Sequence, residues 1–358
     1  MGISSSVTDV RVSAPMLAAW TERVFVASGV PPVSSKVVAD CLVTADLKGM
    51  PSHGVSRIPI YIQRIRLGLV CPNANPKILR ESPSALQIDA ANGLGHPTAS
   101  WGMRLCVEKA RRTGSAVAGI FNSTHFGMAG YYAEIGAREG VIGIATSNSS
   151  PRMAPWGSRD ALLGTNPLAI AVPGPDGGPI VLDMATSVAA LGKIMLAAAD
   201  GTPIPDAWAL DADGHPTTDA AAALKGTVLP VGGPKGSGLA FMLDVLSGVL
   251  TGGSFGSQVR SLYRDMSNPE QCAHFLFAID VEAFQPISEF RARMERYAGE
   301  FKRCRPMPGV SEVYLPGELE RRCERVGRAE GLRLPSKTYE DLIQVARDTG
   351  VPFDWVAA

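Results

Sequence analysis

The sequence predicts a mixed α/β protein in which helical ends enclose a middle rich in β-strands. Between residues 76 and 185, short apolar runs alternate with amphipathic stretches, whereas both ends of the chain are almost wholly amphipathic. The runs 167–173 and 179–185 are joined by the turn GPDGG and predict a hairpin. A hairpin argues against a purely parallel sheet.

The N-terminal end carries two predicted helices, 13–28 and 34–48, and a third after residue 57. We expect a serine to cap the start of each of the first two helices. Gly29 and Gly49 stand where glycines commonly end helices.

The middle and C-terminal parts supply the remaining elements. The predicted strands are 76–81, 85–90, 116–121, 141–147 and 274–280, and the predicted helices are 98–114, 129–140, 236–250, 288–304, 317–331 and 336–350. We therefore expect residues 1–75 and 261–358 to form one helical domain, and residues 76–260 to form a second domain around the sheet.

Composition excludes several function classes. The 358 residues carry 34 Lys+Arg and 34 Asp+Glu, so there is no basic footprint for nucleic acid. No apolar stretch is long enough to span a membrane, and the N-terminus lacks the pattern of a signal peptide. The six cysteines form no C-x-x-C pair, and no His/Cys spacing suggests a metal. We expect a cytoplasmic enzyme without a metal.

Two glycine-rich stretches are candidates for phosphate-binding loops. GLGHPT at 93–98 lacks the final glycine of the G-x-G-x-x-G fingerprint, and we interpret it as a chance match. GGPKGSG at 232–238 combines flanking glycines with Lys235 just before a predicted helix, so it is either an anion-binding turn or a tight loop with a solvated lysine.

The stretch GMPSHGVSR, residues 49–57, places Ser52 beside His53, with Arg57 four residues further on. If 52–58 forms a helical turn, His53 and Arg57 project from one face. Arg57 could then hold a carboxylate while His53 exchanges a proton with the neighbouring oxygen. A serine hydrolase is the competing interpretation, but there is no G-x-S-x-G motif and adjacent side chains are expected to diverge.

Two further stretches present polar groups at the ends of predicted strands. Thr165 lies in the Thr-Asn-Pro turn of residues 154–173 and could present a hydroxyl to a cleft. Asp183 ends the strand in LDMATS and is either a ribose acceptor or a helix cap.

Together these stretches resemble the malate/L-lactate dehydrogenase-like oxidoreductases of the non-Rossmann type. That family includes ureidoglycolate and sulfolactate dehydrogenases, diketogulonate reductase and the piperideine/pyrroline-2-carboxylate reductases. The residues that carry the resemblance occur in the family's order along nearly the whole chain: DLKGMPSHGVSR, NSTHFGMAGYYA, GIATSNSSPRMAPWG, LLGTNPLAIAVP, VLDMATS, GGPKGSGLAFMLDVLSGVLTG and GVSEVYLPGE.

The resemblance implies a large, mostly antiparallel sheet in a cofactor domain, a helical domain formed by both termini, and a homodimer. It also implies hydride transfer between NAD or NADP and C2 of a 2-oxo or 2-hydroxy acid of the malate, lactate or sulfolactate type. The alternative on the same scaffold is reduction of a cyclic imino acid such as piperideine- or pyrroline-2-carboxylate.

The resemblance also implies residue roles. Ser52 would orient His53, which would be the general acid/base, and Arg57 would hold the substrate carboxylate with help from Thr165. In the ureidoglycolate branch the histidine at the His125 position is the base instead, and we prefer His53. The residues that match cofactor positions are His125, Phe126, Gly127, Met128, Ala129, Ser149, Asp183, Met184, Ala185, Lys235, Gly317 and Glu318.

The chain departs from the family pattern near the expected cofactor site. Pro234 and Ser237 replace two aromatic residues of the glycine-rich turn, and Leu191 replaces an arginine before Gly192 and Lys193. These departures leave the choice between NAD and NADP open.

Overall fold

The computed structural model describes residues 10–353 of the chain. The described chain divides into a terminal unit, which comprises residues up to Asn73 and from Pro316 onward, and a sheet unit, Ala74–Leu315. Residues 1–9, at the N-terminus where the signal-peptide pattern is lacking, lie outside the described range. Among the described residues, no helix is both long and apolar enough to cross a bilayer.

The terminal unit is built from helices of both ends of the chain. Its elements are β1 (Val10–Val12), α1 (Ala14–Ala27), α2 (Pro32–Leu47), α3 (Ile58–Arg66), α10 (Glu318–Glu330), β11 (Leu332–Leu334) and α11 (Ser336–Thr349). α1 packs on α2, α10 also contacts α2, and α11 contacts α3. β1 and β11 pair antiparallel and so join the two ends of the chain.

The predicted serine cap is found at the start of α1 and not at the start of α2. Ser13 caps α1, because its hydroxyl accepts a hydrogen bond from the Met16 amide. The predicted serine cap of the second helix is wrong: α2 begins at Pro32, and Ser35 lies inside it and donates its hydroxyl to the carbonyl of Val30. Proline at the first helical position needs no capped amide, which explains the earlier start.

The sheet unit contains a seven-stranded sheet of order β2-β3-β4-β10-β5-β6-β7. The strands are β2 (Lys77–Glu81), β3 (Ala85–Asp89), β4 (Ser115–Ser123), β5 (Val141–Ser147), β6 (Leu168–Pro173), β7 (Pro179–Met184) and β10 (Cys272–Asp280). Only the β3–β4 pair is parallel, and β6 and β7 form the predicted hairpin. The expected large, mostly antiparallel sheet is confirmed.

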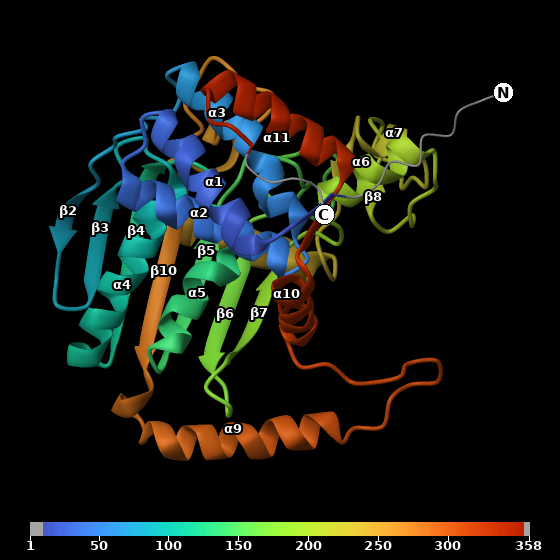
Figure 1. Cartoon of the computed structure of the whole chain (residues 1–358). Coiled ribbons are helices and arrows are strands. Elements are labelled where there is room, and N and C mark those ends of the chain that lie inside the picture. The colour runs from blue at the N-terminus through green and yellow to red at the C-terminus, as the bar shows by residue number, and fades with distance from the viewer. Residues whose placement is uncertain (1–9, 354–358) are drawn as a thin grey trace. The chain divides into compact units, whose positions relative to one another are not determined.

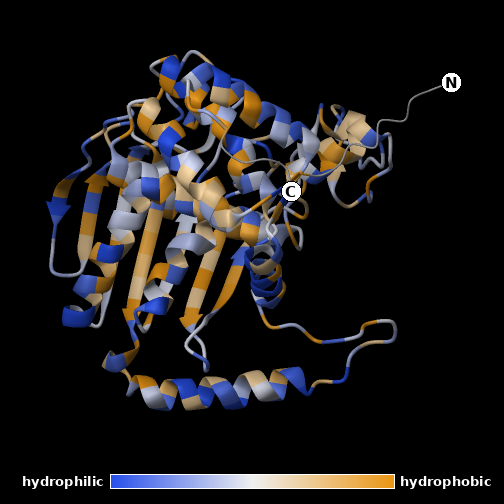
Figure 2. Ribbon diagram, viewed as in Figure 1, coloured by the Kyte–Doolittle hydropathy of each residue, from blue (hydrophilic) through white to orange (hydrophobic). Residues whose placement is uncertain are grey.

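Two helices, α4 (Gly95–Thr113) and α5 (Ala129–Arg138), pack side by side on one face of this sheet (Figure 1). Hydrophobic residues run along the central strands (Figure 2). α4 starts inside the stretch GLGHPT, where a Cβ on Gly95 would lie only 2.4 Å from the Thr124 carbonyl oxygen. The glycine therefore allows close packing at the start of α4.

The predicted return of the chain to the helical domain at residue 261 is wrong. β10 inserts between β4 and β5 at the centre of the sheet, and the sheet unit extends to Leu315. The reason is physical: the apolar strand 272–280 is buried best between two other strands. The unit also includes α9 (Ile287–Lys302), which follows β10.

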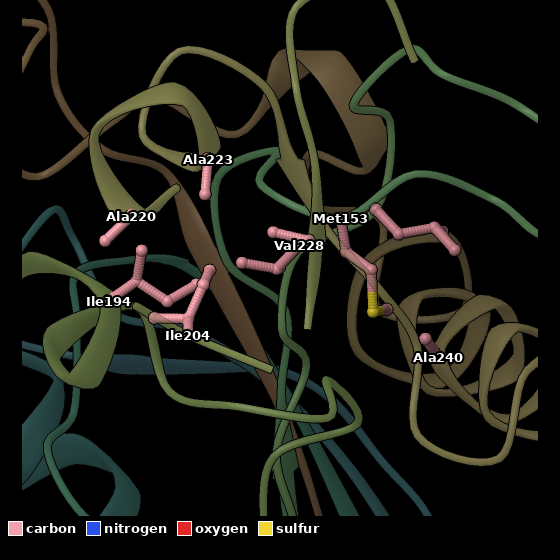
Figure 3. Close-up of a cluster of buried hydrophobic side chains, with 9 residues drawn as sticks. Met153, Ile194, Ile204, Ala220, Ala223, Val228 and Ala240 are labelled. Carbon is pink, nitrogen blue, oxygen red and sulfur yellow. The ribbon is translucent and has the colours of Figure 1, made fainter. Parts of the chain in front are cut away.

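A smaller cluster of elements follows β7 in the sheet unit. They are α6 (Leu191–Asp200), β8 (Ala209–Leu210), α7 (Ala220–Ala223), β9 (Thr227–Val228) and α8 (Pro234–Asp244). Buried side chains including Met153, Ile194 and Val228 form their common core (Figure 3). The predicted helix 236–250 is α8, which gives way to a π-helical turn at Val245–Val249.

Candidate functional site

The stretch 51–57 of the terminal unit forms two 3₁₀ turns instead of the single helical turn on which the shared face of His53 and Arg57 depended. The turns are Pro51–His53 and Val55–Arg57, and Gly54 between them is extended. Arg57 nevertheless folds back on the first turn, because its Nε donates a hydrogen bond to the carbonyl of Ser52. Ser52, His53 and Arg57 are therefore held together by backbone geometry within six residues.

Ser52 and His53 are hydrogen-bonded to each other, so the expectation that their side chains diverge is wrong. Ser52 Oγ lies 3.0 Å from His53 Nδ1. A hydroxyl can donate or accept, so this contact is compatible with either neutral tautomer of the ring. His53 can therefore present Nε2 either as a proton acceptor or as a donor.

The pKa of His53 is lowered from 6.5 to about 4, first by burial and then by the charge of Arg57. Both causes disfavour the imidazolium form. At neutral pH the ring is therefore neutral, which is the form that a proton acceptor needs.

Asp46 supports this turn from the end of α2, and the sequence reasoning missed it. Its Oδ2 accepts a hydrogen bond from the amide of Val55 at 2.8 Å. Burial raises the pKa of Asp46 to about 7, and the Val55 hydrogen bond opposes that rise. A Cβ on Gly54 would lie 2.2–2.3 Å from this carboxyl group, so only glycine allows the close approach. An aspartate followed eight residues later by a glycine was the available signal.

His125 lies in the sheet unit, immediately after β4. Its amide donates to the buried Glu270 carboxylate at 2.9 Å, and its Nδ1 accepts a hydrogen bond from the Gly127 amide at 3.3 Å. A backbone amide can only donate, so this contact favours the neutral tautomer with its proton on Nε2. Such a ring presents a donor and is poorly suited to accept a proton there. Glu270 is another residue that sequence reasoning missed.

The run that follows His125 is buried, as Phe126 and Met128 are 2% and 3% exposed. The Phe126 ring stacks on His274 with centroids 4.4 Å apart and on Tyr132 at 4.7 Å. These side chains are core residues, so the run can offer a ligand mainly its backbone and the half-buried His125 ring.

Asp183, at the end of β7, acts across the sheet unit as a helix cap. Its Oδ2 accepts a hydrogen bond from the amide of Gly130, in the first turn of α5, at 2.7 Å. A carboxylate at a helix start satisfies an otherwise unpaired amide and complements the helix dipole. Met184 and Ala185 follow it and are half-buried.

Ser149, Thr165 and α8 are joined by Asn166, a fully buried residue that sequence reasoning missed. The amide of Thr165 donates to Ser149 Oγ at 3.1 Å, and the amide of Ser149 donates to Asn166 Oδ1 at 3.1 Å. Asn166 Nδ2 then donates to the carbonyl of Ala240, in α8, at 3.0 Å. One amide side chain thus fixes the loops after β5 and before β6 relative to α8.

The turn around Lys235 has the features of an anion site. Gly232 and Gly233 have φ values of +62° and +61°, and Lys235 is an exposed cation in the first turn of the 11-residue α8. Ser237, one departure from the family pattern, accepts a hydrogen bond from the Trp156 amide at 2.9 Å. Pro234 opens the helix. The departures therefore preserve a helix start that can receive a phosphate group.

The remaining predicted pair, Gly317 and Glu318, opens α10 in the terminal unit. Gly317 has a φ of +75° and is the N-cap residue. Glu318 Oε1 pairs with Arg322 Nη2 at 2.7 Å. The Glu318 carboxylate is therefore engaged within its own helix.

Comparison with known proteins places these residues in context. The sequence profile of the malate/L-lactate dehydrogenase family matches residues 12–343. The chain belongs to this family. The malate dehydrogenase of Pyrococcus abyssi is 38% identical over 96% of this chain and 96% of its own. The L-sulfolactate dehydrogenase of Methanothermobacter thermautotrophicus is 39% identical over 92% of this chain and 94% of its own.

Solved structures of the family share the fold. The sulfolactate dehydrogenase of Methanocaldococcus jannaschii superposes with a TM-score of 0.90 at 37% identity, covering 95% of this chain and 97% of that one. The family also contains proteins whose names specify a cofactor, the ureidoglycolate dehydrogenase (NAD(+)) of Escherichia coli and the (2R)-3-sulfolactate dehydrogenase (NADP(+)) of Chromohalobacter salexigens, each 37% identical. It further contains the Δ1-piperideine-2-carboxylate reductase of Pseudomonas syringae, with a TM-score of 0.82 at 31% identity. The chain is thus an oxidoreductase of a family whose named members include dehydrogenases of 2-hydroxy acids such as malate and sulfolactate.

Proposed function

We propose that the protein transfers a hydride between NAD or NADP and C2 of a small 2-hydroxy or 2-oxo acid of the malate, lactate or sulfolactate type. Arg57 binds the C1 carboxylate, since a guanidinium can pair with both oxygens of a carboxylate. His53 takes the proton from the C2 hydroxyl during oxidation and returns it during reduction. Ser52 holds the ring through Nδ1. Thr165 contributes a hydroxyl that contacts the substrate.

The observation that carries the assignment of His53 is the difference in hydrogen bonding between the two histidines. His53 Nδ1 faces a hydroxyl that can donate or accept, whereas His125 Nδ1 faces an amide that can only donate. His53 can therefore offer an unprotonated Nε2, and its lowered pKa keeps it neutral at pH 7. We assign His53 as the acid/base and His125 as a hydrogen-bond donor.

The sheet unit fits a dinucleotide cofactor at two places. Lys235 and the first turn of α8 suit a phosphate, and the backbone of 125–129 is anchored by Glu270 and Asp183 at the start of α5. Ser149, Met184, Ala185, Gly317 and Glu318 are the further proposed contacts. The bound nicotinamide supplies the hydride donor or acceptor. The protein's own residues orient the substrate and move the proton.

An oxidation screen tests the reaction. NADH or NADPH consumption should be measured with pyruvate, oxaloacetate, 3-sulfopyruvate and the cyclic imine piperideine-2-carboxylate. We expect turnover with at least one 2-oxo acid, and slower turnover with the imine. Faster turnover of the imine would favour the alternative, which the reductase of Pseudomonas syringae suggests.

Paired variants test the acid/base. His53→Ala should lower kcat by about 10²–10⁴-fold, the range for loss of general acid/base catalysis, and leave the dissociation constant of NADH unchanged. His125→Ala should retain more activity than His53→Ala. The reverse order of effects would contradict the assignment.

A serine hydrolase is the alternative from a different class, since Ser52 and His53 are hydrogen-bonded. Labelling of Ser52 by a fluorophosphonate together with no NAD(P)H turnover would support it. We also propose a cytoplasmic homodimer, which light scattering of the purified full chain tests.

A further inference from the structure

Arg152 is held rigidly in the sheet unit, just after β5. Its amide donates to the carbonyl of Leu163 at 2.9 Å, and its carbonyl accepts from the amide of Val228 at 3.0 Å. The next residue, Met153, is buried in the small apolar core shown in Figure 3. The backbone of Arg152 therefore has little freedom, and its half-buried side chain starts from a fixed position.

A second arginine lies close to the first. Arg152 Nη2 is 3.4 Å from Ser261 Oγ, and the same hydroxyl accepts a hydrogen bond from the Arg264 amide at 3.1 Å. The pKa of Arg152 is lowered, first by partial burial and then by the charge of Arg264. The Arg152 guanidinium is thus held at Ser261, and the backbone of Arg264 is held at the same hydroxyl.

The neighbouring acids make contacts with groups other than these two arginines. Within the described part of the chain, neither Arg152 nor Arg264 forms an ion pair. The acid beside Arg264, Asp265, accepts hydrogen bonds from the amides of Ser267 and Asn268 and interacts with the charge of Arg260. Glu270 accepts from the His125 amide instead.

Two like charges of which one is half-buried repel each other, and partial burial of Arg152 adds a desolvation cost. A bound anion offsets both costs, because it can pair with the Arg152 guanidinium and is attracted by the charge of Arg264. We propose that Arg152, Arg264 and Ser261 form an oxyanion subsite for a carboxylate, sulfonate or phosphate group of a ligand. Guanidinium groups bind all three kinds of oxyanion through paired N–H donors.

The position of the subsite connects it to the predicted ligand contacts. Arg152 lies three residues after Ser149, and its backbone partner Leu163 lies two residues before Thr165. The ligand's identity rests on the proposed function. The second acidic group of a malate- or sulfolactate-type substrate is the source that we favour, and a cofactor phosphate is the other.

Anion binding tests the subsite without catalysis. The melting temperature of the full chain should rise with added sulfate above a chloride control of equal ionic strength. Arg152→Gln and Arg264→Gln should lose this sulfate-specific rise. Arg260→Gln removes the same charge from an exposed neighbour and should keep it. An equal sulfate response in the wild type and all three variants would overturn the proposal.

Kinetics identify the source of the anion. Loss of one charged contact should lower kcat/KM for oxaloacetate or 3-sulfopyruvate by about 10–100-fold, with little change for pyruvate. A weaker affinity for NADPH with unchanged affinity for NADH would instead assign the subsite to a cofactor phosphate. If no 2-oxo acid is turned over, the proposed function fails, while the sulfate result still decides the subsite.

Two controls test whether the arginine variants change the structure instead of the anion contact. Each variant should keep the circular dichroism spectrum and elution volume of the wild type. A shift in elution volume of both arginine variants would place the pair in a contact between copies of the chain and overturn the ligand subsite.

Discussion

The 51–57 turn of the terminal unit, where we propose the acid/base, and the proposed ligand loops of the sheet unit are built in opposite ways. Ser52, His53 and Arg57 lie within six residues and are joined by local contacts. Most of the proposed cofactor residues follow β4 or β5, end β7 or open α8, and hydrogen bonds between residues far apart in sequence, such as Gly130 to Asp183, join these segments. One added atom can disturb a local turn without unfolding the unit around it. Loss of a long-range hydrogen bond, in contrast, also lowers the stability of the fold.

Among variants that keep the proposed acid/base, the largest effect should follow from Gly54→Ala. The new Cβ would stand 2.2 Å from the Asp46 carboxyl group, which must move and release the Val55 amide. A displacement of about 1 Å at a catalytic group can cost about 100-fold in rate. We therefore expect kcat to fall by about that factor while NADH binding persists.

Gly192→Ala is the matched control, because a Cβ there meets no atom within 4 Å. Its stability should equal that of the wild type or rise slightly, since alanine favours helices. Near-normal turnover of Gly54→Ala would show that the turn tolerates movement of Asp46.

An intermediate effect should follow from Asn166→Ala in the sheet unit. The variant leaves the Ser149 amide and the Ala240 carbonyl without their partner. Unsatisfied buried groups cost about 1–3 kcal/mol each, so the free energy of unfolding should fall by about 2–6 kcal/mol. Chemical denaturation measures the loss, and Asn268→Ala, which removes exposed contacts to Asp265, is the control. Equal stability of the two variants would contradict the network.

The smallest effect concerns pH. Because the pKa of His53 is about 4, kcat/KM for hydroxy-acid oxidation should stay level well below pH 6.5 and fall only as the ring becomes protonated near pH 4. Because the pKa of His53 is lower in the folded chain, the unfolded chain binds the proton more tightly. The contribution of neutral His53 to folding stability is therefore lost as pH falls from 6.5 toward 4.

NMR titration of His53 in Arg57→Gln checks the cause. Removing the cation should raise the pKa of the ring, although burial should hold it below 6.5. An unchanged pKa would show that Arg57 does not act on the ring.

The sequence predicted elements better than arrangements. The periodicity of apolar residues located most helices and strands, and the GPDGG turn identified the β6–β7 hairpin. The sequence did not predict α6 or the position of β10 in the sheet. The neighbours of a strand depend on which surfaces remain unburied after the other elements have packed.

The candidate site shows the same division. The sequence by itself determined which residues could carry the chemistry, since the Ser-His pair and the arginine lie within one short stretch. Only the tertiary structure decided how each is tuned: Asp46 beneath the turn, Glu270 and Gly127 on His125, Asn166 between the loops. Hydrogen bonds and pKa shifts depend on distances between groups that chain folding brings together, and spacing along the sequence does not specify those distances.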